Sequence, residues 1–484
     1  MAEQSLKDKT VKGTFWSAAD AFLGQGVTFL VGLVLARLLS PDEYGLIGIC
    51  IIFNTVLNGI VDSGFCNALI RKNNCTDVDY NTMFFTNLVF SIVLYVILFL
   101  CAPAISLFFE RDELTPLIQV SGSVLIFNAL SLTHTTILTK LIDFKTKTKA
   151  SIVSALISGG IGISMAYMGA GAWSLVGQMV SRQLLYTICL WFFIRWWPKL
   201  PVSVESFRYM WGFGWKLLLS GMLNNIWNQL YQVVVGKFYS PATLGQYTRS
   251  RDFARIFSEN FTTIVQRVSY PVLSHIQDEK ERMIEAYRKI IKVTMFATCV
   301  CLMMLAAVAE PLIVTIIGPQ WREAATYLPY ICLSMSFYPL HAINLNMLQI
   351  QNRTDIFLVI DIIKKIIAIP PILAGIFISI KCMLICSIFV GMISFFLNSY
   401  YTGIKLGYTS WMQLKDVLPD YLISFSICIP VFFLKYIYCS DWFILLIQLF
   451  VGAVLGLLVC EKIKLPEYLE VKRIVFSYLS RKNK

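Results

Sequence analysis

Long apolar stretches alternate with short charged or Pro- and Gly-containing breaks along the whole chain. A helix that spans a bilayer needs about 20 mainly apolar residues, and dividing the chain at its breaks gives about fourteen such stretches. The pattern therefore predicts an all-α polytopic membrane protein. The predicted spans are 14–37, 45–70, 81–103, 117–141, 148–168, 172–195, 210–237, 243–268, 287–309, 324–349, 354–379, 381–404, 416–438 and 440–460.

Composition agrees with this pattern. Of the 484 residues, 57% are hydrophobic before glycine is counted and 14% are charged, and the mean hydropathy is +0.67. Soluble domains average about 45–50% apolar and about 25% charged residues, so the surplus apolar surface needs lipid around it. These values exclude a soluble enzyme, a secreted disulfide scaffold and an ordinary nucleic-acid-binding protein.

The 13 cysteines lie mostly inside apolar stretches, and the closest pairs lack the flanking polar residues of a metal site. We therefore expect neither a metal nor a cofactor. The first apolar stretch, from about Phe15 to Leu39, is long enough to span a bilayer. We expect it to stay as an anchor and not to be cleaved.

The distribution of basic residues predicts the orientation. Lys and Arg concentrate in cytoplasmic loops of membrane proteins, and the chain has a net charge of +12. Of its 41 Lys and Arg residues, 29 fall on the side of the N-terminus, six on the other side and six within spans. This split predicts both termini in the cytoplasm. The loops are too short for a catalytic domain, so no enzyme is expected.

The two halves of the chain repeat each other at an offset near 200 residues. SPDEYG at Ser40–Gly45 recurs as SPATLG at Ser240–Gly245, and His134 parallels His341. In both hexapeptides we expect Pro to end one helix, Ser or Asp to cap the next and Gly to permit a tight return. Both histidines are expected to be hydrogen-bonded in the helix packing, with a proton relay as the alternative.

Six spans separate the two copies of the repeat, so the copies have the same orientation and are related by an axis along the membrane normal. The repeat predicts two pseudo-symmetric six-helix bundles with a cleft between them, plus two extra helices. The predicted domains are residues 1–196, residues 197–404, and residues 405–484 with a basic cytoplasmic tail.

Four segments together resemble the polysaccharide-export branch of the MOP flippase superfamily: LARLLSPDEYGL (Leu35–Leu46), VDSGFCNALIRKNN (Val61–Asn74), LGQYTRSRDFARI (Leu244–Ile256) and YPVLSHIQDEKER (Tyr270–Arg282). They are most similar to teichuronic-acid and colanic-acid exporters, the Wzx-like lipid-linked oligosaccharide flippases. The resemblance covers most of the chain, and it implies the MOP fold.

The resemblance also implies a function. Such a protein moves undecaprenyl-diphosphate-linked repeat units of O-antigen, capsule or exopolysaccharide across the bacterial inner membrane by alternating access. The implied partners are the lipid-linked oligosaccharide, membrane lipids, and a polymerase or glycosyltransferases of the same pathway. No nucleic acid is implied.

The predicted span at 243–268 contains the candidate substrate-binding residues Arg249, Arg251 and Arg255. An ionisable side chain inside a span costs roughly 2.5–3.5 kcal/mol on insertion scales, so it normally faces a cavity or a partner. At about 100° per residue, one face of this helix collects Arg251, Arg255, Ser258, Glu259, Thr262 and Gln266. The sequence thus predicts a face that is wet for several turns.

Arg251 and Arg255 stand one helical turn apart. This spacing suits a diphosphate, because each planar guanidinium group binds phosphate oxygens through two hydrogen bonds. In the alternative, Asp252 and Glu259 neutralise the two arginines. The residues alone leave both interpretations open.

The predicted span at 354–379 contains Asp361 and two further candidate substrate-binding residues, Lys364 and Lys365. Lys365, four residues after Asp361, is better placed to pair with it, which leaves Lys364 as the freer cation. A site for an anionic headgroup, a charge relay and snorkelling to the interface are the open interpretations.

Polar side chains also recur at helical spacing in other spans. Amides suit sugar hydroxyls, but they equally form hydrogen bonds between helices, and the pattern favours the second role. The polar candidates for the cavity are Asn54, Asn58, Asp62, Asn224, Asn228 and Asp20.

A multidrug or small-molecule antiporter on the same fold is the alternative function, with Asp20 as its coupling site. A cationic substrate wants an acidic cavity. The candidate charges here are Arg251, Arg255, Lys364 and Lys365 against Asp252, Glu259 and Asp361. This balance is positive and favours an anionic substrate.

Overall fold

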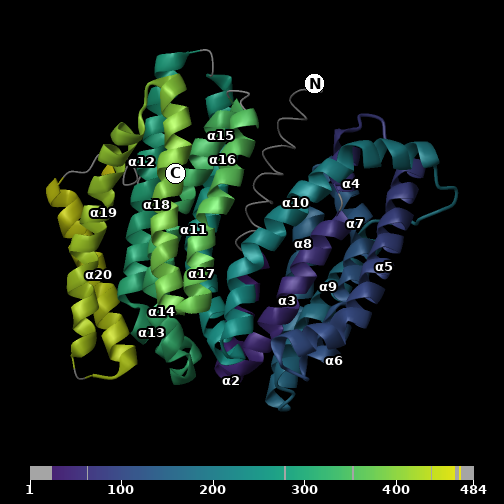
Figure 1. Cartoon of the computed structure of the whole chain (residues 1–484), viewed down its shortest axis with the longest axis horizontal. Coiled ribbons are helices and arrows are strands. Elements are labelled where there is room, and N and C mark those ends of the chain that lie inside the picture. Colours follow the sequence, from purple (N-terminus) through teal and green to yellow (C-terminus); the bar gives the residue numbers. More distant parts are fainter. Residues whose placement is uncertain are drawn as a thin grey trace, which may run out of the picture. The chain divides into compact units, whose positions relative to one another are not determined.

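The structure is a computed structural model, and it describes residues 24–62, 64–276, 279–350, 354–437, 439–463 and 468–469. These residues form helices and their connections, without a strand among them, so the all-α prediction is confirmed. The chain divides into two compact units, residues 1–245 and 246–484. Figure 1 labels the helices of both.

The described part of the first unit begins with the short apolar helix α2 and ends at Gly245, in the first turns of α11. Its helices are α2 (Gln25–Leu38), α3 (Pro41–Asp62), α4 (Phe65–Arg71), α5 (Asp77–Phe109), α6 (Leu114–Ser121), α7 (Val124–Lys140), α8 (Phe144–Tyr167), α9 (Ala172–Phe193) and α10 (Val204–Phe238).

The helix α11 starts at the end of the first unit and continues through the second. The helices from there on are α11 (Pro241–His275), α12 (Lys280–Ala307), α13 (Ala309–Ile317), α14 (Arg322–Met335), α15 (Tyr338–Ile350), α16 (Thr354–Ile367), α17 (Ile369–Phe377), α18 (Ile380–Leu406), α19 (Ser410–Phe433) and α20 (Asp441–Ile463). Two short 3₁₀ turns, Pro319–Trp321 and Leu434–Tyr436, join neighbouring helices.

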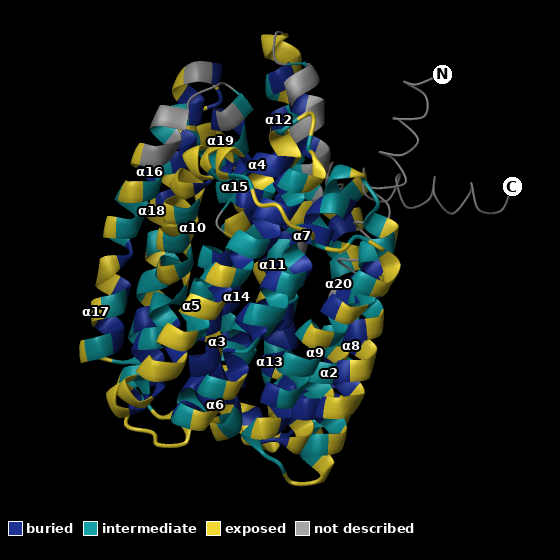
Figure 2. Cartoon of the chain, turned by 90° about the vertical axis from the view of Figure 1, so that its right-hand side faces the viewer, coloured by how far each residue is buried: buried dark blue, intermediate teal, exposed yellow. Residues whose placement is uncertain are grey.

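Eight of the described helical segments are long and apolar enough to cross a membrane. The other predicted spans coincide with helices that are shorter or more polar, so a number of about fourteen is consistent with the structure. Large apolar side chains stay exposed in both units, among them Leu100, Phe192, Phe377 and Phe450 at 70–78%. Figure 2 colours exposed residues yellow along many of the helices. Such surfaces suit lipid, and the chain is a multi-pass membrane protein.

The repeat is visible in the helix boundaries. The fourth predicted span of each half consists of two helices, with α6 and α7 in the first half and α14 and α15 in the second. The breaks fall at Gly122–Ser123 and at Ser336–Phe337. An apolar pattern could not show these breaks, because the hydrophobicity continues through them.

The two Ser-Pro turns cap their helices as predicted. Ser40 Oγ accepts a hydrogen bond from the backbone N of Glu43 at 3.4 Å, and Ser240 Oγ accepts one from Thr243 at 3.2 Å. The predicted role of the glycines was wrong. Gly45 and Gly245 do not form the return of the chain, because each lies inside the helix that follows.

The linker between the two halves, residues 194–203, is bound to the first unit. The backbone N of Lys199 donates to Asn81 Oδ1 at 3.0 Å, and that of Ser203 donates to Thr82 Oγ1 at 3.0 Å. Both acceptors lie in the first turns of α5. The linker therefore runs along this end of the unit as a fixed segment.

The compact units meet in sequence at Gly245 and Gln246, inside α11. The helix α10 packs against α3, α4 and α5, which places it in the first unit. The predicted domains, residues 1–196, 197–404 and 405–484, follow the sequence repeat and stay a prediction.

Candidate functional site

The basic residues at the start of α11 surround Asp252. Arg255 Nη2 lies 3.6 Å from Asp252 Oδ1, and Arg249 Nη1 lies 3.7 Å from Asp252 Oδ2. These distances are too long for direct hydrogen bonds. One carboxylate thus faces two guanidinium groups. The Arg255 side chain is 51% exposed and that of Arg249 17%, so Arg255 is the more accessible cation.

Glu259 lies within electrostatic range of Arg255, one turn earlier on α11, and of Arg251, two turns earlier. The internal pairing that the sequence left open is thus present in part, since Asp252 and Glu259 both face arginines. Three arginines against two carboxylates leave this part of α11 positive. A bound anionic group would complete the neutralisation.

The prediction of a continuous wet face on α11 was wrong for its hydroxyl residues. Ser258 and Thr262 are buried. Ser258 Oγ donates to the backbone O of Met335 in α14 at 2.7 Å, and Ser250 Oγ donates to Ala324 O, also in α14, at 2.6 Å. Small hydroxyl side chains let two helices approach closely and find backbone acceptors. Polarity alone could not distinguish this packing face from a wet one.

The charged residues of α16 pair as their spacing predicts. Lys365 Nζ lies 2.9 Å from Asp361 Oδ2, an i,i+4 ion pair. Lys364 lies within electrostatic range of Asp361 and of His341 in α15. The prediction that Lys365 is the closer partner of Asp361 is confirmed. A role of Lys364 toward substrate stays a prediction.

The two membrane histidines are held in the helix packing, as expected. His134 Nε2 lies 3.2 Å from the backbone O of Trp196, and its ring stacks on Trp191. His341 Nδ1 lies 3.1 Å from Asn398 Nδ2.

The asparagines of α3 belong to a network of hydrogen bonds between helices. Asn54 Nδ2 donates to Ser121 Oγ in α6 at 3.2 Å, and Asn58 Nδ2 donates to the backbone O of Asn54 at 2.8 Å. Asn128 Nδ2 in α7 donates to Asn58 Oδ1 at 2.8 Å, and Gln183 in α9 reaches Asn128 at 3.5 Å. The network joins α3 to three other helices.

The remaining polar candidates of the first unit lie elsewhere. Asn224 and Asn228 of α10 are exposed, and Asp62 is exposed at the end of α3. Asp20 lies outside the described residues. The side chain of Asn225, next to Asn224 in α10, fills the space beside Gly59 of α3.

Sequence reasoning missed two buried carboxylates of α19, Asp416 and Asp420. Asp416 pairs with Arg288 of α12, with Oδ1···Nη2 and Oδ2···Nε distances of 2.6 and 2.5 Å, and accepts from Tyr408 Oη at 2.8 Å. The signal was available: two carboxylates one turn apart open the predicted span at 416–438. The ion pair of Asp416 with Arg288 joins α19 to α12.

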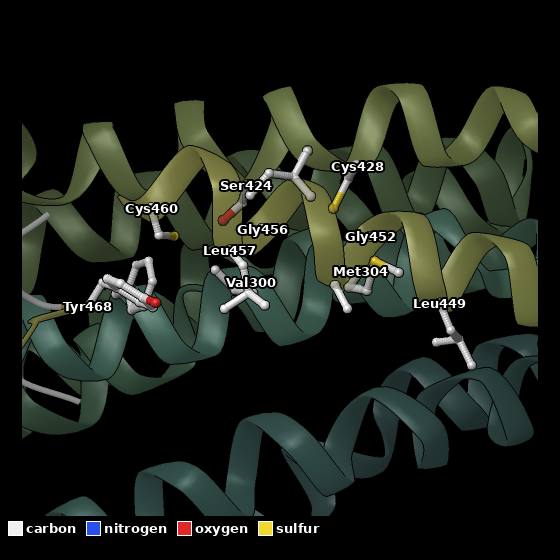
Figure 3. Close-up of a pocket in the computed structure, with 13 residues that line it drawn as sticks. Val300, Met304, Ser424, Cys428, Leu449, Gly452, Gly456, Leu457, Cys460 and Tyr468 are labelled. Carbon is white, nitrogen blue, oxygen red and sulfur yellow. The ribbon is translucent and has the colours of Figure 1, made fainter. Parts of the chain in front are cut away.

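An apolar pocket of about 520 Å³ lies among α12, α19 and α20. Figure 3 shows side chains from all three helices around it, including Val300 and Met304 of α12, Cys428 of α19, and Leu457 of α20. Gly452 also lines it. The Ser424 hydroxyl adds a polar atom to walls that are otherwise mostly carbon and sulfur. Such a pocket accommodates an alkyl or isoprenoid chain.

The fold defines the class of protein first. A lipid II flippase, MurJ in an inward closed conformation, superposes with a TM-score of 0.68 at 14% identity, over 93% of this chain and 97% of that one. An inward-facing multidrug transporter of the MATE family, within the MOP superfamily, superposes with a TM-score of 0.62 at 12% identity, over 80% and 98%. The chain thus has the fold of the MOP-superfamily transporters.

The family follows from the sequence. Residues 34–326 match the family model described as polysaccharide biosynthesis protein, and the chain belongs to this family.

Curated relatives agree with this membership. The chain is 23% identical to the lipopolysaccharide biosynthesis protein WzxC of Escherichia coli (strain K12), over 77% of this chain and 76% of that one. It is 21% identical to the teichuronic acid biosynthesis protein TuaB of Bacillus subtilis (strain 168), over 73% of each. It is 24% identical to the succinoglycan biosynthesis transport protein ExoT of Rhizobium meliloti (strain 1021), over 68% and 67%.

Proposed function

We propose that this protein is a flippase that moves an undecaprenyl-diphosphate-linked oligosaccharide across the bacterial inner membrane by alternating access. Its family and the names of its relatives support a transport step in the synthesis of a surface polysaccharide. The likeness to MurJ supports a fold on which lipid-linked substrates are moved. The observation that carries the proposal is the positive cluster on α11.

The cluster suits a diphosphate because of its charge and its exposure. Arg255 presents half of its side chain, and Asp252 is too distant to satisfy its guanidinium donors. A diphosphate brings several acceptor oxygens, each of which forms a charge-assisted hydrogen bond with an arginine. Arg251, one turn away, would bind the second phosphate.

The lipid part of the substrate needs an apolar surface. The pocket among α12, α19 and α20 offers one in the unit that contains the α11 cluster. We propose that this pocket binds a segment of the isoprenoid chain, while the diphosphate and the sugars bind outside the pocket. The sugars need hydrogen-bonding groups, and the exposed amides Asn224 and Asn228 are our candidates for them.

Orientation and partners belong to the proposal. With both termini in the cytoplasm, the lipid-linked unit is loaded where glycosyltransferases assemble it and released to a polymerase on the other side. A multidrug antiporter is the alternative. The positive charge of α11 and the ion pair of Lys365 with Asp361 favour an anionic substrate over a cationic one.

The proposal is tested with purified protein in vesicles that contain undecaprenyl-diphosphate glycans. Arg255→Ala should reduce flipping about tenfold or more, because a hydrogen bond to a charged group is worth about 1.5–3 kcal/mol. Arg255→Lys should retain part of it. Arg282→Ala is the matched control, since Arg282 is an exposed arginine paired with Glu279 in another part of the second unit. Wild-type flipping by an Arg251→Ala/Arg255→Ala protein at equal abundance would remove the cluster from the mechanism.

A further inference from the structure

The break between α14 and α15 leaves a tyrosine exposed inside a predicted span. The break falls at Ser336–Phe337, in the middle of the predicted span 324–349. Ser336 Oγ lies 2.7 Å from Tyr421 Oη, and the rings of Phe337 and Tyr421 pack with their centroids 5.7 Å apart. The next residue, Tyr338, is 44% exposed. The break therefore fixes the backbone at Tyr338 while the ring of this tyrosine stays accessible.

A glutamate of α11 lies near this tyrosine. Ser258 Oγ donates to the backbone O of Met335 at 2.7 Å, which fixes α11 against the last turn of α14. Glu259 is the next residue of α11, and its carboxylate lies within electrostatic range of Tyr338. All four residues belong to the second unit. The break thus brings a carboxylate of α11 near an aromatic ring of α15.

The acceptor oxygens of Glu259 are available to a ligand. Arg249 and Arg255 form their ion pairs with Asp252. Among the described residues, none forms an ion pair or a side-chain hydrogen bond with the Glu259 carboxylate. A carboxylate inside a membrane span normally faces a cavity or a partner and not lipid. Glu259 therefore indicates that Tyr338, its neighbour, is exposed on a side turned away from lipid.

The position of Glu259 along α11 suits the first sugar of the proposed substrate. That sugar is bonded directly to the diphosphate, and Arg255 is the accessible cation for the diphosphate. Glu259 follows Arg255 by four residues, a rise of about 6 Å along the same face of the helix. A sugar joined to a phosphate at Arg255 is therefore within reach of Glu259.

A carboxylate beside an exposed aromatic ring is complementary to a pyranose. A pyranose has hydroxyl groups around its edge and C–H groups on the faces of its ring. A carboxylate accepts charge-assisted hydrogen bonds from the hydroxyls. The C–H face packs on an aromatic side chain, which offers a large, rigid apolar surface. One sugar can therefore use both groups at once.

We propose that Glu259 and Tyr338 form the subsite for the first sugar of the lipid-linked oligosaccharide, next to the diphosphate at Arg251 and Arg255. The group recognised is a pyranose joined to the diphosphate through its anomeric oxygen. The proposal rests on the proposed flippase function and deepens it, since it separates recognition of the sugar from recognition of the diphosphate.

The test compares two lipids on the full-length protein in lipid nanodiscs, by their equilibrium dissociation constants. One lipid is undecaprenyl diphosphate, and the other carries a single glucose, galactose or N-acetylglucosamine on that diphosphate. For at least one sugar, the wild-type protein should bind the sugar-bearing lipid about tenfold more tightly, because a hydrogen bond to a charged group adds to the stacked ring.

Two outcomes separate the subsite from the proposed function. Equal binding of undecaprenyl diphosphate and of all three sugar-bearing lipids would overturn the subsite and leave the proposed function standing. A wild-type protein that binds none of these lipids would overturn the proposed function, and the subsite with it.

Substitution of Tyr338 tests the stacking. Tyr338→Leu should lose most of the preference for the sugar-bearing lipid, whereas Tyr338→Phe, which keeps the ring, should retain most of it. Tyr400→Leu is the matched control and should keep the full preference, since Tyr400 is an exposed tyrosine of α18 in the same unit. A full preference in the Tyr338→Leu protein would overturn the stacking role.

Substitution of Glu259 gives a signature that a purely structural role does not. Glu259→Gln keeps the shape of the side chain but removes a negative charge near Arg251 and Arg255. Binding of undecaprenyl diphosphate should therefore become tighter, while the preference for the sugar-bearing lipid falls. An equal change in both affinities would leave the preference intact, and it would show that Glu259 is only a counter-charge of the arginines.

Discussion

The asparagines of α3 and of α10 have the same spacing and different surroundings. Asn54 and Asn58 of α3 are four residues apart and are hydrogen-bonded to α6, α7 and their own helix. Asn224 and Asn228 of α10 are also four residues apart, and both are exposed. The spacing of amides in a membrane helix therefore does not define their role. Their role depends on whether another helix packs against them.

The contrast also separates stability from transport. Amides that bind other helices stabilise the fold, and exposed amides at membrane depth need water or a polar ligand. The first pair should respond to substitution through unfolding, and the second through transport. Each prediction below tests that separation.

The largest effect is expected for Asn58→Leu. This change removes the acceptor of Asn128 and one donor to Asn54 O, so partly buried polar groups lose hydrogen bonds worth about 0.5–1.5 kcal/mol each. The midpoint of thermal unfolding in detergent should fall clearly. An unchanged midpoint would mean that the amide network does not hold α3, and the comparison would fail.

The second prediction concerns α10. Asn224→Leu/Asn228→Leu should leave the unfolding midpoint unchanged and reduce flipping severalfold, because exposed amides are our candidates for binding sugar. Asn225→Leu is the matched control: its side chain packs beside Gly59, so it should lower the midpoint. Equal loss of stability in the two proteins would show that both faces of α10 serve packing.

The third prediction applies the same separation within α16. Lys365→Gln strands Asp361, its partner at 2.9 Å, and should chiefly reduce protein abundance. Lys364→Gln should reduce flipping at normal abundance, and Lys364→Arg should retain part of it. Measuring abundance and flipping on the same samples decides the matter, since equal losses in both Gln variants would make the pair structural.

The smallest effect is expected at the exposed pair of Glu110 and Lys237, 2.8 Å apart. The hydrogen bond from Lys237 lowers the pKa of Glu110 below its ordinary value of about 4.3. A depressed pKa stabilises the fold above that ordinary value, and the contribution is lost as the pH falls through the lowered pKa. Solvent screens an exposed pair, so Glu110→Gln should shift the unfolding midpoint barely at pH 7, and less as the pH falls through the lowered pKa. A large shift at pH 7 would contradict the exposed environment.

The helices of this protein were predictable because apolar length is set by the thickness of the bilayer. The breaks inside the fourth spans were not, since hydrophobicity continues through Gly122 and Ser336. The repeat gave the caps at Ser40 and Ser240 correctly, because capping is local. It misplaced the role of Gly45 and Gly245, because the backbone they contact is 200 residues away.

The candidate site shows the same limit. The pair of Asp361 and Lys365 lies within one turn, so its register could be read from the sequence. The pair of Arg288 and Asp416 joins residues 128 positions apart, which no helical spacing indicates. Ser258 is buried because its hydroxyl binds the backbone O of Met335 in α14, and the polarity of the sequence around Ser258 does not indicate this partner.

The hydrogen bonds of the linker have a consequence for how the protein is made. Lys199 and Ser203 complete the bonding of Asn81 and Thr82, so the first half lacks part of its own structure until residue 203 has left the ribosome. To produce the halves as separate polypeptides, the chain should therefore be divided after Ser203. Division at residue 196 would separate Asn81 and Thr82 of α5 from their backbone donors, Lys199 and Ser203.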